Sequence, residues 1–201
     1  MSAFWKAPLP SLGDRRKRSI GLLGGSFNPA HEGHLHISLL AKKALALDEV
    51  WWLVSPQNPL KPVKGMASFQ DRLGKARKCV APYPFLKITA IEAQLGTRYS
   101  ADTVARLKKR LPGIRFVWLM GADNLSQLPR WRGWTSLVKL LPVAVMARPA
   151  YSLPALAGKA AKRYERFSTS SRKLIGAIPP AWSFLWLKEH PASATDIRAN
   201  Q

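Results

Sequence analysis

The sequence predicts a single doubly wound α/β domain built around a central parallel sheet. Short, nearly continuous apolar runs alternate along the chain with longer segments whose apolar residues recur at helical spacing. Strands that are covered on both faces give continuous apolar runs, whereas strands with one solvated face alternate between apolar and polar residues. Strands and helices that take turns in this way are typical of a parallel sheet with helices on both sides.

The first half of the chain opens this alternation. "SIGLLGGSF" (19–27) is expected to be a buried strand that ends in a Gly-Gly loop, and "HLHISLLAKKALAL" (34–47) a helix with Leu35 and Leu39 on one side. "PQNPLKPVKGMAS" (56–68) is rich in proline and has no period, which indicates a loop. The other elements expected in this half are the strand 49–56, the helix 69–81 and the strand 85–92.

The second half repeats the pattern. "IRFVWLMGAD" (114–123) is the clearest strand of the chain, and it ends in Gly-Ala-Asp. "WSFLWL" (182–187) is the last expected strand, and "SATDIRAN" (193–200) resembles the start of a helix. The other elements expected in this half are the helices 100–111, 135–141 and 152–175 and the strand 143–148.

Length and composition favour a cytoplasmic protein. The 201 residues fit one domain, 19–201, which follows a basic extension without periodicity, 1–18. The longest apolar candidate for a membrane span is interrupted by Lys139 and Pro142, and the N-terminal charges follow the apolar residues, the reverse of a secretory signal. The single cysteine, Cys79, excludes an internal disulfide and fits a reducing compartment.

The net charge of +21, from 32 Lys and Arg against 11 Asp and Glu, favours anionic partners. Nucleic acid, an acidic surface and small polyphosphates all meet this requirement. The basic residues recur along the whole chain, so most of them are expected on solvated helix faces. Weak, non-specific nucleic-acid binding is therefore expected, and a basic nucleic-acid-binding module without enzymatic activity is one alternative function.

The stretch "GGSFNPAHEGH" (24–34) joins the first strand to the first helix. Gly24 and Gly25 lack side chains where a backbone approaches a ligand, and Ser26 adds a hydrogen-bond donor. His31 and His34 lie near the start of the helix, where free N–H groups and the helix dipole attract phosphate. Three residues apart, both histidines can face the same anion.

Two other interpretations compete for these histidines. Zinc binding through "HEGHLH" offers His31, His34 and His36, but Cys79 and His190 are the only further soft ligands that suit such a site. A structural role at the helix start is the second alternative. The Gly-Gly-Ser segment and the strand-to-helix position favour phosphate.

The same stretch resembles the GG[ST]F[DN]Px[HT]xGH motif of the HxGH nucleotidyltransferases. "GTRYSADT" (96–103), "MGADNLSQLPRW" (120–131) and "SATDIR" (193–198) narrow the resemblance to bacterial nicotinate-nucleotide adenylyltransferases. The resemblance implies a Rossmann-like fold and a reaction of NAD biosynthesis. In that reaction ATP and nicotinate mononucleotide give deamido-NAD and pyrophosphate, with Mg²⁺ that arrives with ATP and is not held by protein side chains.

The resemblance also implies roles for individual residues. His31 and His34 would be catalytic, contacting the α- and β-phosphates of ATP. Ser100 and Trp131 would bind nicotinate mononucleotide, near its carboxylate and by stacking on its ring, while Trp134 is expected in the core. The expected ATP-binding residues are Gly24, Gly25, Ser26, Phe27, Lys61, Gly121, Asp123, Ser193, Thr195 and Arg198.

Three of these residues have ordinary structural alternatives. Lys61 can be a solvated loop lysine, while Asp123 and Ser100 can each be the N-cap of the helix that follows. Asn28 departs from the Asp of many relatives, and Ala192 and Ala194 depart from the C-terminal motif. Another HxGH transferase, such as phosphopantetheine adenylyltransferase, is the alternative enzyme, but those relatives usually carry Thr in place of His31 and lack the Trp131 segment.

Overall fold

The computed structural model describes residues 17–57 and 65–186. The predicted extension 1–18 lies almost entirely outside these ranges, as do Lys61 and the motif 193–198. In the part that is described, no helix is both long and apolar enough to cross a bilayer.

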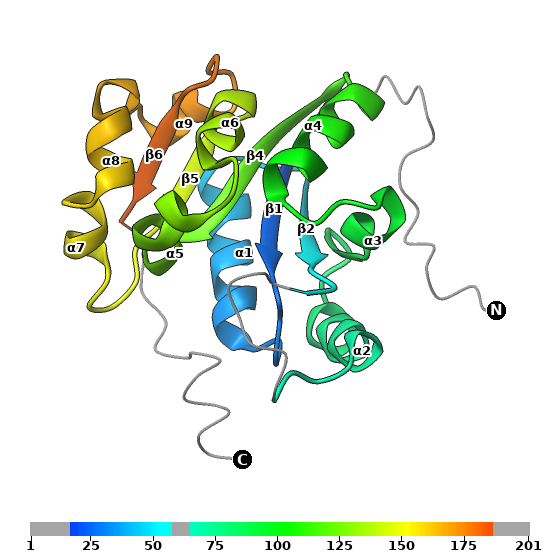
Figure 1. Cartoon of the computed structure of the whole chain (residues 1–201). Coiled ribbons are helices and arrows are strands. Elements are labelled where there is room, and N and C mark those ends of the chain that lie inside the picture. The colour runs from blue at the N-terminus through cyan, green and yellow to red at the C-terminus, as the bar shows by residue number, and fades with distance from the viewer. Residues whose placement is uncertain (1–16, 58–64, 187–201) are drawn as a thin grey trace.

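The described strands form one parallel sheet in the order β3-β2-β1-β4-β5-β6. The chain first builds outward from β1 to β3 and then returns to β1, adding β4 to β6 on its other side. This arrangement confirms the predicted doubly wound α/β fold with a central parallel sheet (Figure 1). The strands are β1 (Arg18–Gly25), β2 (Glu49–Val54), β3 (Leu86–Thr89), β4 (Ile114–Gly121), β5 (Val143–Met146) and β6 (Trp182–Leu185).

Helices cover both faces of the sheet (Figure 1). Neighbouring residues of one strand point to opposite faces, so Leu22 and Trp118 belong to one buried cluster and Leu23 and Leu119 to the other. This explains the continuous apolar runs of the sequence. The helices are α1 (Glu32–Ala44), α2 (Phe69–Val80), α3 (Ile91–Leu95), α4 (Ser100–Arg110), α5 (Ala122–Gln127), α6 (Trp134–Leu140), α7 (Ser152–Leu156), α8 (Lys159–Tyr164) and α9 (Ser171–Leu174).

The predicted strands end a few residues too late, and two of them extend into residues that are helical. β3 ends at Thr89, and Ile91 already begins the short helix α3, so Glu92 is helical. β4 ends at Gly121, and α5 starts directly after it. In both places the apolar run continues from a strand into a buried helix, and periodicity does not separate the two over so few residues.

Residues 152–175, expected to be helical, form several short helices and not one continuous helix. Gly158 separates α7 from α8, and a Cβ atom there would lie 3.1 Å from the carbonyl oxygen of Ala155. Farther on, Ser168 forms a bridge with Trp182 of β6, whose indole N–H donates to the Tyr164 carbonyl (2.8 Å). These contacts with the edge strand replace helical hydrogen bonds.

The reversal of strand order lies between β1 and β4. In open parallel sheets, ligands bind at such a point, beyond the carboxyl ends of the strands. The arrowheads of β1 and β2 mark this edge in Figure 1, and α1 begins there. The loops after β1 and β4 are therefore expected to form the ligand site.

Candidate nucleotide-binding site

The loop after β1 is tightly constrained by the core below it. A Cβ atom on Gly24 would lie 2.8 Å from the ring of Trp118, so packing alone requires glycine at this position. Phe27 has a left-handed backbone (φ 48°), which is uncommon for a residue with a side chain. Its buried ring stacks on Trp52 at 4.9 Å and lies 4.8 Å from the ring of His34. The packing of this ring holds the backbone in a conformation that costs about 1–3 kcal/mol.

His31 and His34 form a reciprocal cap at the start of α1. The Gly33 N–H donates to Nδ1 of His31 (3.1 Å), and the His31 N–H donates to Nδ1 of His34 (3.3 Å). The helix begins at Glu32 with His31 as its N-cap, two residues earlier than predicted. Both histidines therefore do have the structural role at the helix start that the sequence left open, and this role is compatible with phosphate binding.

The cap also determines which ring nitrogen can donate. Because Nδ1 accepts a hydrogen bond in both rings, a neutral imidazole carries its proton on Nε2. The two rings lie 3.9 Å apart, centre to centre, at the N-terminus of a helix of 13 residues. Two N–H donors and the positive end of a helix dipole thus occupy one place, which suits a phosphate group.

A hydrogen-bonded chain anchors His34 from behind. The Trp52 indole N–H donates to Ser38 (2.7 Å), and the Ser38 hydroxyl donates to the carbonyl of His34 (2.8 Å). Trp52 and Ser38 are fully buried. The first turn of α1 is therefore fixed to β2 as well as to β1.

Arg72 of α2 is a buried residue that sequence reasoning missed, having placed the basic residues of 69–81 on a solvated face. Its guanidinium donates to the carbonyls of Ser26 (2.6 Å), Ser55 (2.7 Å), Pro56 (2.8 Å) and Ala67 (3.1 Å). Desolvation lowers the pKa of this group from its ordinary value. A signal was present in the sequence, because Arg72 precedes the buried residues Ala76 and Val80 by four and eight positions.

Asn28 also ties this loop to the segment before α2. Its Nδ2 donates to the carbonyl of Gly65 (3.3 Å), and its Oδ1 accepts from the Ala67 N–H (3.2 Å). A carboxylate could accept but could not donate. The departure from Asp therefore adds a contact that an ionised Asp could not make.

Asp123 follows β4 on the other side of the reversal. It lies in the first turn of α5, whose N-cap is Gly121, so the predicted N-cap role of Asp123 is wrong. Its carboxylate pairs with Arg148 (3.1 Å), beyond the end of β5. A Cβ atom at Gly121 would lie 2.5 Å from Asp123 Oδ1, which explains the glycine.

The two predicted acceptor-binding segments lie against each other. Gly133, with φ 69°, approaches Ala101 so closely that a Cβ atom would lie 3.2 Å from its side chain. Arg132 lies over the ring of Tyr99 at 4.7 Å and hydrogen-bonds to its hydroxyl. Ser100 and Trp131 are thereby brought to neighbouring segments, as predicted residues of one site must be.

In these segments one structural expectation is wrong and another is confirmed. Ser100 is the first residue of α4 and Tyr99 its N-cap, so the N-cap alternative for Ser100 is wrong. Trp131 is half-buried and meets the buried Trp118 edge-on at 6.3 Å. Trp134 packs against the core and the ring of Tyr164 (5.8 Å), as expected.

Glu92 of α3 is buried just beyond the carboxyl end of β3. Its carboxyl accepts from the side chain of Ser55, and Oε2 has no hydrogen-bond partner in the described part of the chain. Burial raises the pKa of this carboxyl from 4.5 to about 7, and the hydrogen bond from Ser55 opposes the shift.

Comparison with known proteins identifies the family. The cytidylyltransferase-like family matches residues 22–200. A protein of Cereibacter sphaeroides named "probable nicotinate-nucleotide adenylyltransferase" is 51% identical over 180 residues, 90% of this chain and 96% of the relative. A protein of Parvibaculum lavamentivorans with the same name is 53% identical over 182 residues, 89% and 90% of the two chains. The chain belongs to the nicotinate-nucleotide adenylyltransferase family.

Solved structures agree on the fold. A nicotinic acid mononucleotide adenylyltransferase of Plasmodium falciparum, complexed with NaAD, superposes with a TM-score of 0.66 at 14% identity, over 90% of this chain and 83% of that one. At this identity the likeness supports the fold alone. The predicted family, its class of enzyme and the Rossmann-like sheet are thus confirmed.

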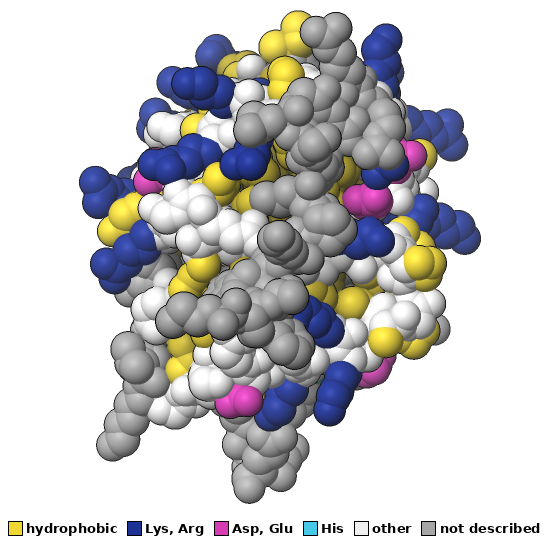
Figure 2. All heavy atoms as spheres, turned by 90° about the vertical axis from the view of Figure 1, so that its right-hand side faces the viewer, with side chains coloured by type: hydrophobic (Ala, Val, Ile, Leu, Met, Phe, Trp, Pro, Cys, Tyr) yellow, Lys and Arg dark blue, Asp and Glu magenta, His cyan; other side chains and the backbone are white. Residues whose placement is uncertain are grey.

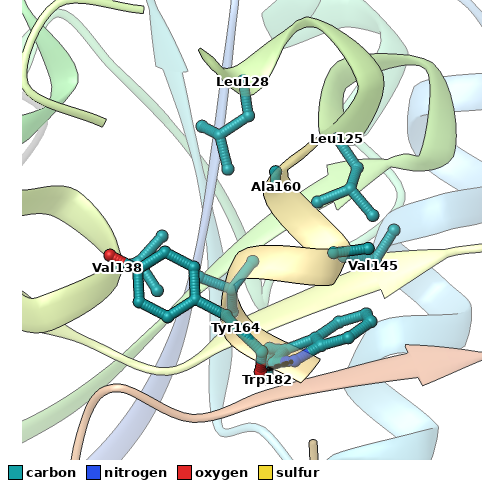
Figure 3. A pocket seen from close by; sticks show the side chains of 9 residues that line it. Leu125, Leu128, Val138, Val145, Ala160, Tyr164 and Trp182 are labelled. Carbon is teal, nitrogen blue, oxygen red and sulfur yellow. Dashed lines mark hydrogen bonds between the residues drawn. The ribbon is translucent and has the colours of Figure 1, made fainter. Parts of the chain in front are cut away.

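A small apolar cavity lies among the described residues, and neither His31 nor His34 lines it. The cavity lies between α5, α6, α8 and the strands β5 and β6 (Figure 3), and its volume is about 10 Å³. A single water fills such a volume, and the lining offers it few polar partners. Its lining residues are Leu125, Leu128, Val138, Val143, Val145, Ala160, Ala161, Tyr164 and Trp182.

Proposed function

We propose that this enzyme transfers the adenylyl group of MgATP to nicotinate mononucleotide, giving deamido-NAD and pyrophosphate. The names of the curated relatives support the reaction. The observation that carries the site is the pair of capped imidazoles at the start of α1, beside the reversal of strand order. The proposed substrates are small nucleotides.

The reaction needs no nucleophile from the protein. The 5′-phosphate of nicotinate mononucleotide attacks the α-phosphorus of ATP; a P–O bond forms there as the bond to pyrophosphate breaks. Positioning and stabilisation of charge supply most of the acceleration in such transfers. His31 and His34 donate from Nε2 to the α- and β-phosphate oxygens, and the dipole of α1 adds to their effect.

Around this centre, the loop after β1 lines the triphosphate with Gly24, Gly25, Ser26 and Phe27. Gly121 and Asp123 bind the ribose of ATP, with Arg148 orienting the carboxylate. Ser100 and Trp131 bind the nicotinate end of the acceptor. Lys61, Ser193, Thr195 and Arg198 complete the phosphate contacts in this proposal; they lie outside the described residues.

Mg²⁺ belongs to the substrate in this account. In the described ranges, no three His, Cys, Asp or Glu side chains gather as they would to hold a metal ion. A cation bound mainly by phosphate oxygens and water fits such a site, because Mg²⁺ usually keeps several waters and few protein ligands. Bound in this way it would neutralise phosphate charge.

A pyrophosphate-release assay with MgATP and a panel of acceptors tests the proposal. Nicotinate mononucleotide should give turnover, and phosphopantetheine should give none. Turnover with phosphopantetheine alone would assign the enzyme to another branch of the HxGH transferases. Release without any acceptor would indicate ATP hydrolysis and contradict transfer.

The basic surface supports a second, weak activity, the binding of nucleic acid without sequence preference. The net charge is +21. Lys and Arg side chains are spread over the face seen in Figure 2, with few acidic side chains between them. A charge distributed in this way attracts polyanions but offers no single recognition surface.

A further inference from the structure

Arg72 joins three segments that are distant in sequence. Nη1 bonds to the carbonyls of Ser26, after β1, and Ser55, after β2; Nη2 bonds to Pro56, and Nε to Ala67. The residue is 1% exposed. One side chain therefore fixes the carboxyl ends of the two strands together with the segment that precedes α2.

The position is a costly one for a cation. In the described part of the chain Arg72 has no carboxylate partner, and its contacts are backbone carbonyls and the ring of Phe69 (5.4 Å). An ionised side chain without a counter-ion is expensive to bury, and an apolar residue often serves stability as well. If this position served only to pack α2 against the core, an apolar residue would suffice, as Leu73 does at the next position.

The bond to Ser26 acts on the next peptide N–H. Because the peptide unit is planar and trans, fixing the Ser26 carbonyl toward Arg72 aims the Phe27 N–H the opposite way. That N–H has no hydrogen-bond partner in the described residues, and a charged donor on the carbonyl polarises the unit and strengthens it as a donor. On its other side the ring of Phe27 is held by Trp52 and His34. The left-handed conformation of Phe27 is thus fixed from both ends.

We propose that Arg72 is a positioning residue for adenylyl transfer, which holds the loop after β1 in the form that receives the triphosphate and places a buried positive charge behind it. The inference rests on the proposed function, because it takes ATP as the ligand of that loop. Arg72 acts through the Ser26–Phe27 peptide and touches no substrate. Its loss should therefore weaken the use of ATP selectively and leave binding of the acceptor unchanged.

The test compares Arg72→Met and Arg72→Lys with two control variants on α2. Leu73→Ala removes a side chain that is 1% exposed and destabilises the same helix without touching the loop. Lys75→Met removes a positive charge from an exposed position. Melting temperature, the dissociation constants of MgATP and nicotinate mononucleotide, and kcat are measured for all variants and the unmodified enzyme.

Arg72→Met should lower kcat/KM for MgATP by about a hundredfold, the loss that a misplacement of about 1 Å can cause. Arg72→Lys keeps the charge but loses the planar set of guanidinium donors, so its kcat/KM for MgATP should lie between the values of Arg72→Met and the unmodified enzyme. Acceptor affinity should stay within about twofold of the unmodified enzyme, well below the tenfold that 1.4 kcal/mol produces. Leu73→Ala should lower the melting temperature and leave both substrate affinities unchanged. Lys75→Met should change neither the melting temperature nor the affinities.

Equal losses for ATP and acceptor in Arg72→Met, matched by Leu73→Ala, would show a structural role and overturn the proposal. So would unchanged kcat/KM for MgATP in a folded Arg72→Met. If Arg72→Met does not fold, Arg72→Lys decides the question. A selective ATP defect in Arg72→Lys supports the proposal, and the absence of such a defect overturns it. Absence of turnover in the unmodified enzyme would instead reject the proposed function.

Discussion

The two sides of the strand reversal are held in different ways. On the β1 side, several contacts hold the loop after the strand: the reciprocal cap of the half-buried His31 and His34, the stack of the buried Phe27 ring, and the hydrogen bonds of the buried Arg72. On the β4 side the predicted contacts rest on one half-buried ring, Trp131, and on one ion pair between Asp123 and Arg148.

This difference matches the chemistry of the proposed reaction. Charge develops at the phosphates in the transition state, and donors that are fixed in advance stabilise it best. Ribose and nicotinate keep their charge during the transfer, so their binding sites need affinity more than rigidity. We therefore expect changes on the β1 side to lower the rate, and changes on the acceptor side to weaken binding.

The largest expected effect is at His34. His34→Ala should lower kcat by a hundredfold or more, since loss of one donor to a charged transition state costs about 3 kcal/mol. His34→Gln is the matched variant, because Gln at this position of a helix retains the acceptor of the cap. Steady-state kinetics and melting curves distinguish the two effects. A near-normal rate in His34→Ala would remove His34 from the mechanism.

Glu92 should make stability depend on pH. Between pH 4.5 and about 7 the folded chain retains a proton that the unfolded chain releases, so stability is highest at low pH and falls as pH rises through this window. The full difference is up to about 3 kcal/mol, at 1.36 kcal/mol for each pKa unit. Glu92→Gln should remove it.

Urea unfolding at pH 5 and pH 8 measures this effect. The loss of stability between the two values should be smaller in Glu92→Gln than in the unmodified protein. Glu165→Gln, an exposed carboxylate far along the chain, serves as the control. Equal pH dependence in all three proteins would mean that Glu92 titrates normally.

Trp131 should govern the acceptor and not ATP. Trp131→Ala should weaken nicotinate mononucleotide about ten- to a hundredfold, since stacking of an aromatic side chain on a base contributes about 1–3 kcal/mol. ATP affinity should hardly change, because its proposed contacts lie in other segments. Separate titrations with a melting curve test this, and Trp134→Ala, in the core, should instead lower the melting temperature. Equal losses for both ligands in a destabilised Trp131→Ala would contradict stacking.

The smallest expected effect is that of surface charge. Binding to duplex DNA should be weak, indifferent to sequence and lost as salt rises, because counterion release drives it. Fluorescence anisotropy at several salt concentrations with two unrelated duplexes measures it. Tight binding at high salt, or a preference for one duplex, would reveal a dedicated nucleic-acid site.

Local patterns were enough to predict most of the fold and the β1 side of the site. Buried strands appear as apolar runs, and the Gly-Gly-Ser and histidine spacing lies in one stretch of the chain. Arg72 was missed because its partners are backbone carbonyls from three segments, and carbonyls leave no mark in a sequence. The helix start at Ala122 was missed for another reason: the apolar run of β4 continues into the buried start of α5, and periodicity does not separate the two over so few residues. The roles of all the predicted site residues stay predictions, and Lys61 and 193–198 lie outside the described residues.

A single-turnover experiment, with enzyme in excess over a limiting amount of ATP and with enzyme and nicotinate mononucleotide both saturating, tests the division between the two sides most directly. Binding is complete under these conditions, so the observed rate reports the transfer step alone. We expect a rate at least a hundredfold lower in His34→Ala, in line with about 3 kcal/mol per donor, and a nearly unchanged rate in Trp131→Ala. Similar losses in both variants, or the larger loss in Trp131→Ala, would contradict it.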